Sequence, residues 1–301
     1  MSNKIIEVKN LKKNYANFTA VSNISFDVFE GNVFGFLGPN GSGKSTTIRI
    51  LLSLIRASGG NVKLFGKDIT TDRNFILSKI GCIVEKPDFY KYLSAEKNIE
   101  LFARISGFKV NKSKIHEMLD FVGLRGREKD KLSGFSHGMK QRLGLAQTLI
   151  HDPELIILDE PTTGLDPQGI IDIRNLILKL KTEKKKTVLL SSHILSEIEL
   201  IADRMVIINK GETVAEGNVQ DLLNAQELIV VFTVDNLVLA KQVLEDFNIV
   251  NFTCQNNDIL LYTSQLQSAE INKLFCLKGV NVFSMETKRK LEDYFLKLIN
   301  H

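Results

Sequence analysis

The sequence predicts an α/β fold, in which helices cover a parallel sheet, followed by a small α+β domain. Three observations predict this arrangement. A glycine-rich loop at residues 38–46 lies between a short apolar run and a helical apolar pattern. Apolar runs typical of fully buried strands then alternate with helical patterns as far as about Leu223. The pattern changes after that residue, so we expect a first domain at residues 1–223 and an accessory domain at residues 224–301.

The glycine-rich loop carries the strongest chemical signal in the chain. The apolar run Val33–Leu37 predicts a buried strand before it, and apolar residues at helical spacing from Ile48 predict a helix that begins at Lys44. The spacing G-x-x-x-x-G-K-[ST] is that of a phosphate-binding loop, whose glycines let backbone N–H groups point at phosphate oxygens. In such a loop Lys44 reaches the β- and γ-phosphates as a catalytic group, and the hydroxyl of Ser45 is placed for Mg²⁺. We therefore expect a P-loop NTPase core that binds a nucleoside triphosphate through Gly38, Pro39, Asn40, Gly41, Ser42, Gly43, Lys44, Ser45 and Thr46.

Residues 86–142 interrupt the alternation of strands and helices. Helical patterns at Ala95–Ser106 and Lys112–Val122 dominate this stretch, so we expect an inserted helical subdomain. Its first aromatic residues are candidates for a docking surface for another protein, and packing in the core of the subdomain is the alternative. These residues are Phe89, Tyr90 and Tyr92.

Two acidic residues end the next predicted strand, Leu155–Leu158. An acid at the carboxyl end of such a strand lies beside the phosphate-binding loop. We expect Asp159 to hold Mg²⁺ through water, and Glu160 to polarise the attacking water. A further buried strand around Val188–Leu190 ends in Ser191, Ser192 and His193.

A second turn with an exposed helix start lies at residues 136–139. Ser136 is a natural helix N-cap, and Gly138 keeps the first turn open, so that N–H groups face an anion. Here the chain resembles the ATPase subunits of ABC transporters, whose signature is usually L-S-G-G-Q followed by Q-R. The similar run Leu132-Ser133-Gly134 is rejected, because Ser136 has the family's distance to Gln141-Arg142. His137 and Met139 depart from the commoner signature, whereas the serine and the second glycine are kept.

The resemblance implies roles for further residues. Asp166, in Pro161–Pro167, would face a partner subunit, and His193 would be the switch histidine that contacts the γ-phosphate. Tyr15 would stack on adenine, with Phe18 as a rival. Glu85 occupies the position of the family's glutamine, where it would keep an acceptor oxygen for Mg²⁺ while adding a negative charge near the γ-phosphate. Lys86 is a candidate to neutralise that charge.

Residues 224–301 predict the order β-α-β-β-α-β followed by a terminal helix, which indicates a small ferredoxin-like domain. The terminal helix would be lined by Leu291, Phe295 and Leu298. This stretch contains no sequence motif of catalytic or metal-binding residues. We therefore expect a packing or dimer-contact module.

Composition excludes several classes of protein. The net charge of the 301 residues is only +4, which does not favour a nucleic-acid binder. The 3 cysteines are too scattered for a disulfide framework or a zinc site, and they fit a reducing, intracellular setting. No apolar stretch approaches the length of a membrane span, and the N-terminus lacks the apolar region of a signal peptide. We expect a cytoplasmic protein that can dock on a membrane partner.

The resemblance, which covers about residues 5–223, implies an ATP-hydrolysing motor that uses ATP and Mg²⁺. Two copies, or two similar subunits, would face each other with two-fold symmetry, each ATP lying between the loop of one and the Ser136–Met139 turn of the other. The motor would be attached to an integral membrane permease at the cytoplasmic side of the membrane. Among the ATPase subunits of ABC-2 exporters, the chain most resembles those of bacitracin resistance and lantibiotic immunity. The resemblance therefore favours export of a drug or peptide. A soluble ABC ATPase acting on ribosomes or nucleic acid, and a non-hydrolysing regulatory subunit, are the alternatives.

Overall fold

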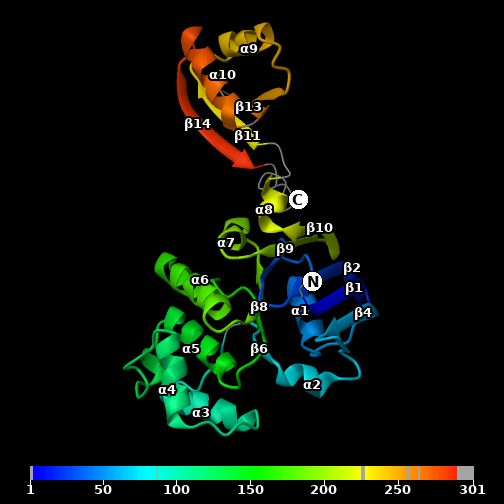
Figure 1. Cartoon of the computed structure of the whole chain (residues 1–301), viewed down its shortest axis with the longest axis vertical. Helices are drawn as coiled ribbons and strands as arrows, with labels where there is room; N and C mark the ends of the chain where they lie inside the picture. The colour runs from blue at the N-terminus through cyan, green and yellow to red at the C-terminus, as the bar shows by residue number, and fades with distance from the viewer. Residues whose placement is uncertain (1–2, 86, 225–227, 256–257, 264, 290–301) are drawn as a thin grey trace. The chain divides into compact units, whose positions relative to one another are not determined.

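The computed structural model describes residues 3–85, 87–224, 228–255, 258–263 and 265–289. The chain divides into two compact units, residues 1–219 and 220–301. Figure 1 labels the helices and strands of both units. The domain boundary expected at Leu223 stays a prediction. Leu223 lies in helix α8 (Val219–Asn224), and the two compact units divide after the first residue of this helix.

A sheet of 10 strands forms the first unit, in the order β5-β4-β1-β2-β10-β9-β3-β8-β7-β6. Five neighbouring strands, from β9 to β6, are all parallel, which confirms the predicted parallel sheet. The bounds are β1 Lys4–Tyr15, β2 Phe18–Phe29, β3 Val33–Leu37, β4 Gly59–Leu64, β5 Lys67–Asp68, β6 Ile80–Ile83, β7 Leu155–Leu158, β8 Thr187–Ser192, β9 Arg204–Asn209 and β10 Glu212–Asn218.

The start of the chain differs from the predicted alternation of strands and helices. The first three strands follow one another without a helix, and β1 pairs antiparallel with both β2 and β4. The connection between β1 and β2 consists of residues 16–17, and so short a link can join only antiparallel strands. An antiparallel arm therefore extends the parallel part of the sheet.

Helices flank the sheet, among them the predicted helices that begin at Lys44 and after Ser136 (Figure 1). The two helical segments of the inserted subdomain are confirmed as α3 and α4, whose first turns are capped by the side chains of Ser94 and Asn111. The first helix is shorter than its apolar pattern, since it ends at Leu51. The bounds are α1 Lys44–Leu51, α2 Arg73–Ser78, α3 Ala95–Ile105, α4 Lys112–Phe121, α5 His137–Leu149, α6 Pro167–Thr182 and α7 Leu195–Glu199.

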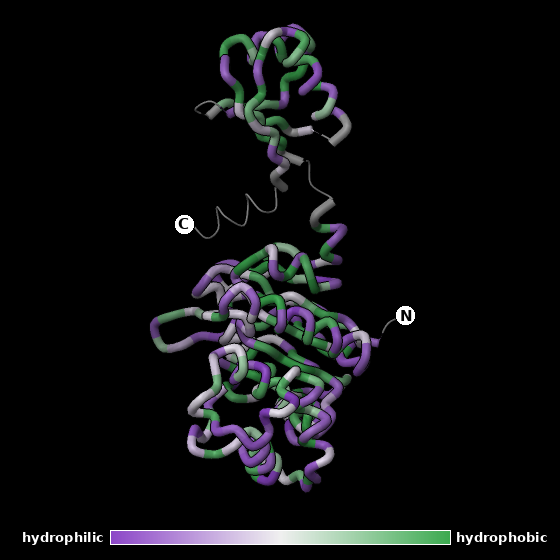
Figure 2. The backbone as a smooth tube through the Cα atoms, turned by 90° about the vertical axis from the view of Figure 1, so that its left-hand side faces the viewer, coloured by the Kyte–Doolittle hydropathy of each residue, from purple (hydrophilic) through white to green (hydrophobic). Residues whose placement is uncertain are grey.

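Aromatic packing fixes the centre of the first unit. The ring of Phe26 stacks on Phe34 with a centroid distance of 5.5 Å and lies 5.1 Å from Phe36, and all three side chains are buried. Burial of a phenylalanine side chain contributes roughly 1.5–3 kcal/mol. Figure 2 shows hydrophobic stretches alternating with hydrophilic ones along the backbone, as expected for elements with one buried side. This packing buries β3, which leads directly into the glycine-rich loop.

The second unit has the predicted order β-α-β-β-α-β, in a four-stranded antiparallel sheet arranged β12-β13-β11-β14. Its two helices cover one face, where Phe232 and Phe275 meet edge to face at 5.5 Å. This is the ferredoxin-like arrangement expected from the sequence. The predicted terminal helix, with Leu291, Phe295 and Leu298, lies outside the described residues. The bounds are β11 Leu228–Val234, α9 Leu237–Asp246, β12 Phe252–Gln255, β13 Asp258–Thr263, α10 Gln265–Leu277 and β14 Val282–Arg289.

Candidate functional site

The glycine-rich loop connects β3 to α1 in a conformation that only glycine adopts easily. Gly41 and Gly43 have φ angles of +80° and +106°, in the left-handed region. A Cβ atom on Gly38 would lie 2.5 Å from the carbonyl oxygen of Ile208. The glycines of the motif are therefore required by the local geometry.

Lys44 lies folded over the loop that precedes it. Its Nζ atom donates to the carbonyl oxygens of Gly38 at 2.8 Å and Pro39 at 3.2 Å, and lies 3.4 Å from Oε1 of Glu160. Burial lowers the pKa of Lys44, while the charges of Glu160 and Asp159 oppose that shift. The ammonium group thus lies buried between the loop and an acidic side chain.

A cavity of about 210 Å³ opens over the loop. The hydroxyl of Ser42 in the loop is buried and has no hydrogen-bond partner among the described residues. An unpartnered buried hydroxyl beside a lysine and a helix start is suited to a phosphate oxygen. The predicted residues Gly38, Pro39 and Ser42 belong to the loop but do not line the cavity. The lining consists of Phe18, Ala20, Asn40, Gly41, Gly43, Lys44, Ser45, Thr46 and Glu160.

The two acidic residues after β7 are held by a serine that the sequence analysis did not single out for a role. The fully buried Ser191 donates its hydroxyl to Oδ1 of Asp159 at 2.5 Å and accepts the N–H of Glu160 at 2.9 Å. The sequence does contain a signal for this role of Ser191: two apolar strands that pair in parallel end, one in two acids and the other in two hydroxyl residues. Ser191 therefore fixes both acids at the carboxyl ends of the parallel strands, where the glycine-rich loop also begins.

Glu160 adopts a left-handed conformation, with φ +47°, which is unusual for a residue other than glycine. Its carboxylate accepts from Thr163 Oγ1 at 3.0 Å, and Nδ1 of His193 lies 3.2 Å from the same oxygen without a hydrogen bond. Burial raises the pKa of Glu160, but the hydrogen bond from Thr163 and the charges of Lys44 and His193 outweigh it, so the pKa is lowered. The structure thus brings Lys44, Glu160 and His193 together, with Glu160 as an ionised acceptor.

Glu85 has an ion-pair partner that the sequence did not indicate. Its Oε1 accepts from Nη2 of Arg49, a residue of α1. The expected neutralising residue, Lys86, lies outside the described residues. Arg49 therefore offsets the charge that glutamate adds at this position, because α1 and the end of β6 lie side by side.

We expect Glu85→Gln to keep the rate of Mg-ATP hydrolysis within about tenfold of the wild type, since the acceptor oxygen remains and an exposed ion pair contributes little. The steady-state rate of phosphate release measures this. Glu100→Gln, which breaks the exposed pair with Arg104, is the matched control. A loss beyond a hundredfold in Glu85→Gln alone would show that the carboxylate has a task of its own.

The predicted signature turn is exposed at Ser136 and half-buried at His137, Gly138 and Met139. Ser136 caps α5 by accepting the N–H of Met139 at 3.2 Å, and a Cβ atom on Gly138 would meet no atom within 4 Å. The rejected run Leu132–Gly134 forms a 3₁₀ turn. The signature residues Ser136, His137, Gly138 and Met139 do not line the cavity over the loop. The single chain therefore leaves this turn apart from its own phosphate-binding loop.

Asp166 has a role within its own chain. It caps α6 by accepting the N–H of Gly169 at 3.2 Å, ahead of Pro167 at the first turn of the helix. The turn before it contains Gly164, where an added Cβ would lie 3.8 Å from Nε2 of His137. The segment around Asp166 thus lies beside the signature turn.

Of the two aromatic candidates for the adenine ring, Phe18 lines the cavity and Tyr15 does not. The two residues pair at the end of the β1–β2 hairpin, and Nζ of Lys13 lies 4.8 Å from the centre of the Tyr15 ring. Tyr15 stays a prediction, and the geometry supports Phe18 more.

We expect Phe18→Ala to weaken ATP binding more than Tyr15→Ala, because a ring stacked on a base contributes roughly 1–3 kcal/mol. Titration with ATP and with tripolyphosphate measures this, since the latter has no base to stack and should bind both variants alike. A larger loss in Tyr15→Ala would assign the stacking ring to Tyr15.

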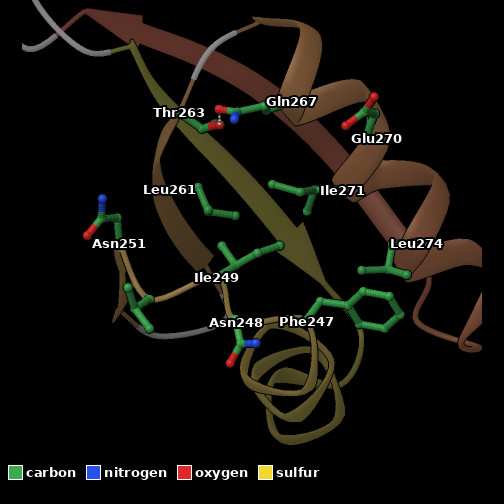
Figure 3. Close-up of a pocket in the computed structure, with 11 residues that line it drawn as sticks. Phe247, Asn248, Ile249, Asn251, Leu261, Thr263, Gln267, Glu270, Ile271 and Leu274 are labelled. Carbon is green, nitrogen blue, oxygen red and sulfur yellow. Dashed lines mark hydrogen bonds between the residues drawn. The ribbon is translucent and has the colours of Figure 1, made fainter.

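The second unit holds a separate cavity of about 490 Å³ between β13, α10 and the connection from α9 to β12. Figure 3 shows Ile249, Leu261 and Ile271 pointing toward one another at its centre. Thr263 Oγ1 donates to Gln267 Oε1 at 2.9 Å on its border. Within the described part of the chain, no group of three or more histidine, cysteine, aspartate or glutamate residues is placed to hold a metal.

Comparison with known proteins agrees with this geometry. The family model described as ABC transporter matches residues 21–163. The chain is 41% identical over 298 residues to the bacitracin transport ATP-binding protein BcrA of Bacillus licheniformis, covering 98% of this chain and 97% of that protein. It is 41% identical over 224 residues to the lantibiotic transport ATP-binding protein SrtF of Streptococcus pyogenes, covering 74% of this chain and 95% of SrtF.

Among solved structures, the dimeric ATP-binding cassette MJ0796, in a post-hydrolysis state bound to ADP and Pi, matches with a TM-score of 0.63 at 26% identity. The match covers 71% of this chain and 98% of that chain. Of the helices in the described residues, none has the length and apolar character needed to span a membrane. The loop, the acid pair and the relatives together show that the chain belongs to the ATP-binding proteins of ABC transporters and is an ATPase.

Proposed function

We propose that this ATPase powers an exporter that carries a drug or peptide, of the bacitracin or lantibiotic kind, through a separate membrane subunit. The observation that carries the proposal is the match to BcrA, which extends over 98% of this chain and so includes the second unit as well as the ATPase core. SrtF, named for lantibiotic transport, matches over a shorter length. Both relatives are named for the transport of peptide antibiotics.

In the proposed site, ATP lies with its phosphates on the 38–46 loop, and Mg²⁺ is held by Ser45, Glu85 and, through water, Asp159. The unpartnered Ser42 hydroxyl and the buried Lys44 support the fit to phosphate. Asp159 is nearly buried and already accepts one hydrogen bond from Ser191, so a water-mediated contact suits it. Mg²⁺ would neutralise charge on the phosphates, while Glu160 orients the attacking water and His193 lies beside Glu160 to contact the γ-phosphate.

We further propose that two copies, or two similar subunits, join with two-fold symmetry. Ser136, His137, Gly138 and Met139 of one copy would contact the γ-phosphate on the other, and Asp166 would lie at the shared interface. Gly138 supports this, because a helical glycine costs roughly 0.5–1 kcal/mol relative to alanine, and among the described residues outside its own helix turn no atom lies within 4 Å of an added Cβ. The dimeric state of MJ0796 is the precedent.

The permease would dock on the exposed aromatic pair at the start of the helical subdomain, which places the protein at the cytoplasmic side of the membrane. Tyr90 and Tyr92 are 42% and 69% exposed, and the centroids of their rings lie 5.9 Å apart. The third expected member, Phe89, is only 8% exposed and packs edge to face on Phe102, so its assignment to the docking surface is wrong. Its ring belongs to the core of the subdomain.

Two measurements test the proposal. Deleting the gene should lower the concentration of bacitracin or of a lantibiotic that stops growth, and the wild-type chain, but not Glu160→Gln, should restore it. A photo-crosslinker at position 92 should label an integral membrane protein, whereas one at the exposed Lys67, on the edge strand β5, should not. Unchanged susceptibility to peptide antibiotics, with crosslinks to ribosomal proteins or nucleic acid, would contradict the proposal.

A further inference from the structure

Glu197 is a buried acid that no local sequence motif indicates. It lies in the short helix α7, and only 9% of the residue is exposed. Its Oε2 atom accepts hydrogen bonds from two hydroxyl groups, Thr162 Oγ1 at 2.8 Å and Ser192 Oγ at 3.1 Å. A buried carboxylate is costly unless hydrogen bonds satisfy it, so both hydroxyls are needed here.

The two hydroxyls come from the two segments that carry the reacting side chains. Thr162 follows Glu160 closely in the chain, and Ser192 directly precedes His193. The segments leave neighbouring parallel strands, β7 and β8, but the strand pairing ends at Leu158 and Leu190. Beyond that point, Glu197 joins the two segments through a single oxygen atom.

Both reacting groups need such support. The left-handed backbone of Glu160 costs of order 1–3 kcal/mol and persists only where its surroundings hold it. Nδ1 of His193 lies 3.2 Å from the Glu160 carboxylate, but within the described part of the chain it makes no hydrogen bond that would fix the ring. The position of His193 relative to Glu160 is therefore set by the backbone on either side, which is where Glu197 acts.

We propose that Glu197 is a positioning residue for ATP hydrolysis, which holds Glu160 and His193 at their working distance by binding Thr162 and Ser192 at once. The proposal rests on the roles assigned above to Glu160 and His193. On this proposal the effect of Glu197 depends on hydrogen bonding and not on its charge, since one carboxylate oxygen accepts the hydrogen bonds from both hydroxyls.

The proposal separates two substitutions of the same residue. Glu197→Ala removes both bonds and should lower kcat by up to about a hundredfold, the effect of displacing a reacting group by about 1 Å. KM for ATP should change little, because none of the hydrogen bonds of Glu197 described above reaches the phosphate-binding loop. Glu197→Gln keeps a carbonyl oxygen that can accept from both hydroxyls, so its kcat should stay within about threefold of the wild type.

Single-bond variants test whether the two hydroxyls act through Glu197. Thr162→Val and Ser192→Ala should each lower kcat, and neither should lower it further in the Glu197→Ala background. Ser196→Ala, at an exposed position of the same helix, is the matched control and should leave kcat and the thermal midpoint unchanged. All rates are measured on the full chain at a temperature where circular dichroism shows each variant folded.

Three results would overturn the proposal. The first is a wild-type kcat in Glu197→Ala. The second is a loss in Glu197→Gln equal to that in Glu197→Ala, which would assign the effect to charge. The third is a loss that follows the folded fraction or raises KM in step, which would make Glu197 merely structural. If Glu160→Gln also hydrolyses ATP normally, the assigned role of Glu160 fails first, and this outcome is distinguishable from failure of Glu197 alone.

Discussion

Glu160→Gln should bind ATP and lose nearly all hydrolysis, with kcat lower by roughly 10²–10⁴-fold, the usual contribution of a general base. The lowered pKa of Glu160 keeps its carboxylate ionised at neutral pH, as an acceptor for the proton of the attacking water must be. An amide of the same shape removes that basicity and leaves the Ser191 bond to the backbone N–H in place. Phosphate release from excess ATP measures the loss.

The same variant should accumulate as an ATP-bound dimer, because ATP holds the proposed interface together until it is cleaved. Size-exclusion chromatography with Mg-ATP measures this. Glu154→Gln is the matched control, since Glu154 precedes the other end of β7, where it pairs with Lys79, and should hydrolyse ATP normally. Equal rates for Glu160→Gln and the wild type would refute the assignment of the base.

Lys44→Ala should weaken ATP binding by about 10–100-fold, the equivalent of a hydrogen bond to a charged group of roughly 1.5–3 kcal/mol. Lys44 is 5% exposed and, among the described residues, its ammonium group contacts the loop carbonyls and Glu160, so a phosphate that enters gains this group directly. Calorimetric titration measures the affinity. Lys67→Ala, at the exposed edge strand, controls for the loss of one positive charge.

Lys44 also gives ATP binding a pH dependence of known sign. Burial lowers its pKa, so the side chain loses its proton at a lower pH than a free lysine does. Affinity of the wild type should fall as pH rises through that lowered pKa, whereas Lys44→Ala should show no such fall. Parallel pH profiles for the two proteins would exclude Lys44 as the phosphate ligand.

The parts of the structure that could be predicted from the sequence are those that local chemistry determines. The strand Val33–Leu37, the loop and the helix at Lys44 follow from apolar runs and from glycines that must adopt positive φ angles. The same is true of α3 and α4, whose capping residues stand directly before their apolar patterns. The order of strands and helices along the chain of the second unit also followed from local apolar patterns.

What could not be predicted depends on segments distant in the chain. Arg49 and Glu85 meet because α1 and the end of β6 are neighbours in space, which no local pattern reveals. Ser191 binds Asp159 and Glu197 binds Thr162, and in each pair the two residues lie more than thirty positions apart in the chain. Tyr15 and Phe18 belong to one hairpin, and only the lining of the cavity separates them.

The outward-facing signature turn has a kinetic consequence on the proposed arrangement. Because Ser136 does not line the cavity of its own chain, turnover would be a property of pairs of molecules. In dilute solution the rate would then rise with the square of the protein concentration. A permease that carries two docking sites would remove this dependence by tethering the copies at millimolar effective concentration. On this arrangement, unattached molecules in dilute solution would hydrolyse ATP slowly, and most hydrolysis would take place on assembled transporters.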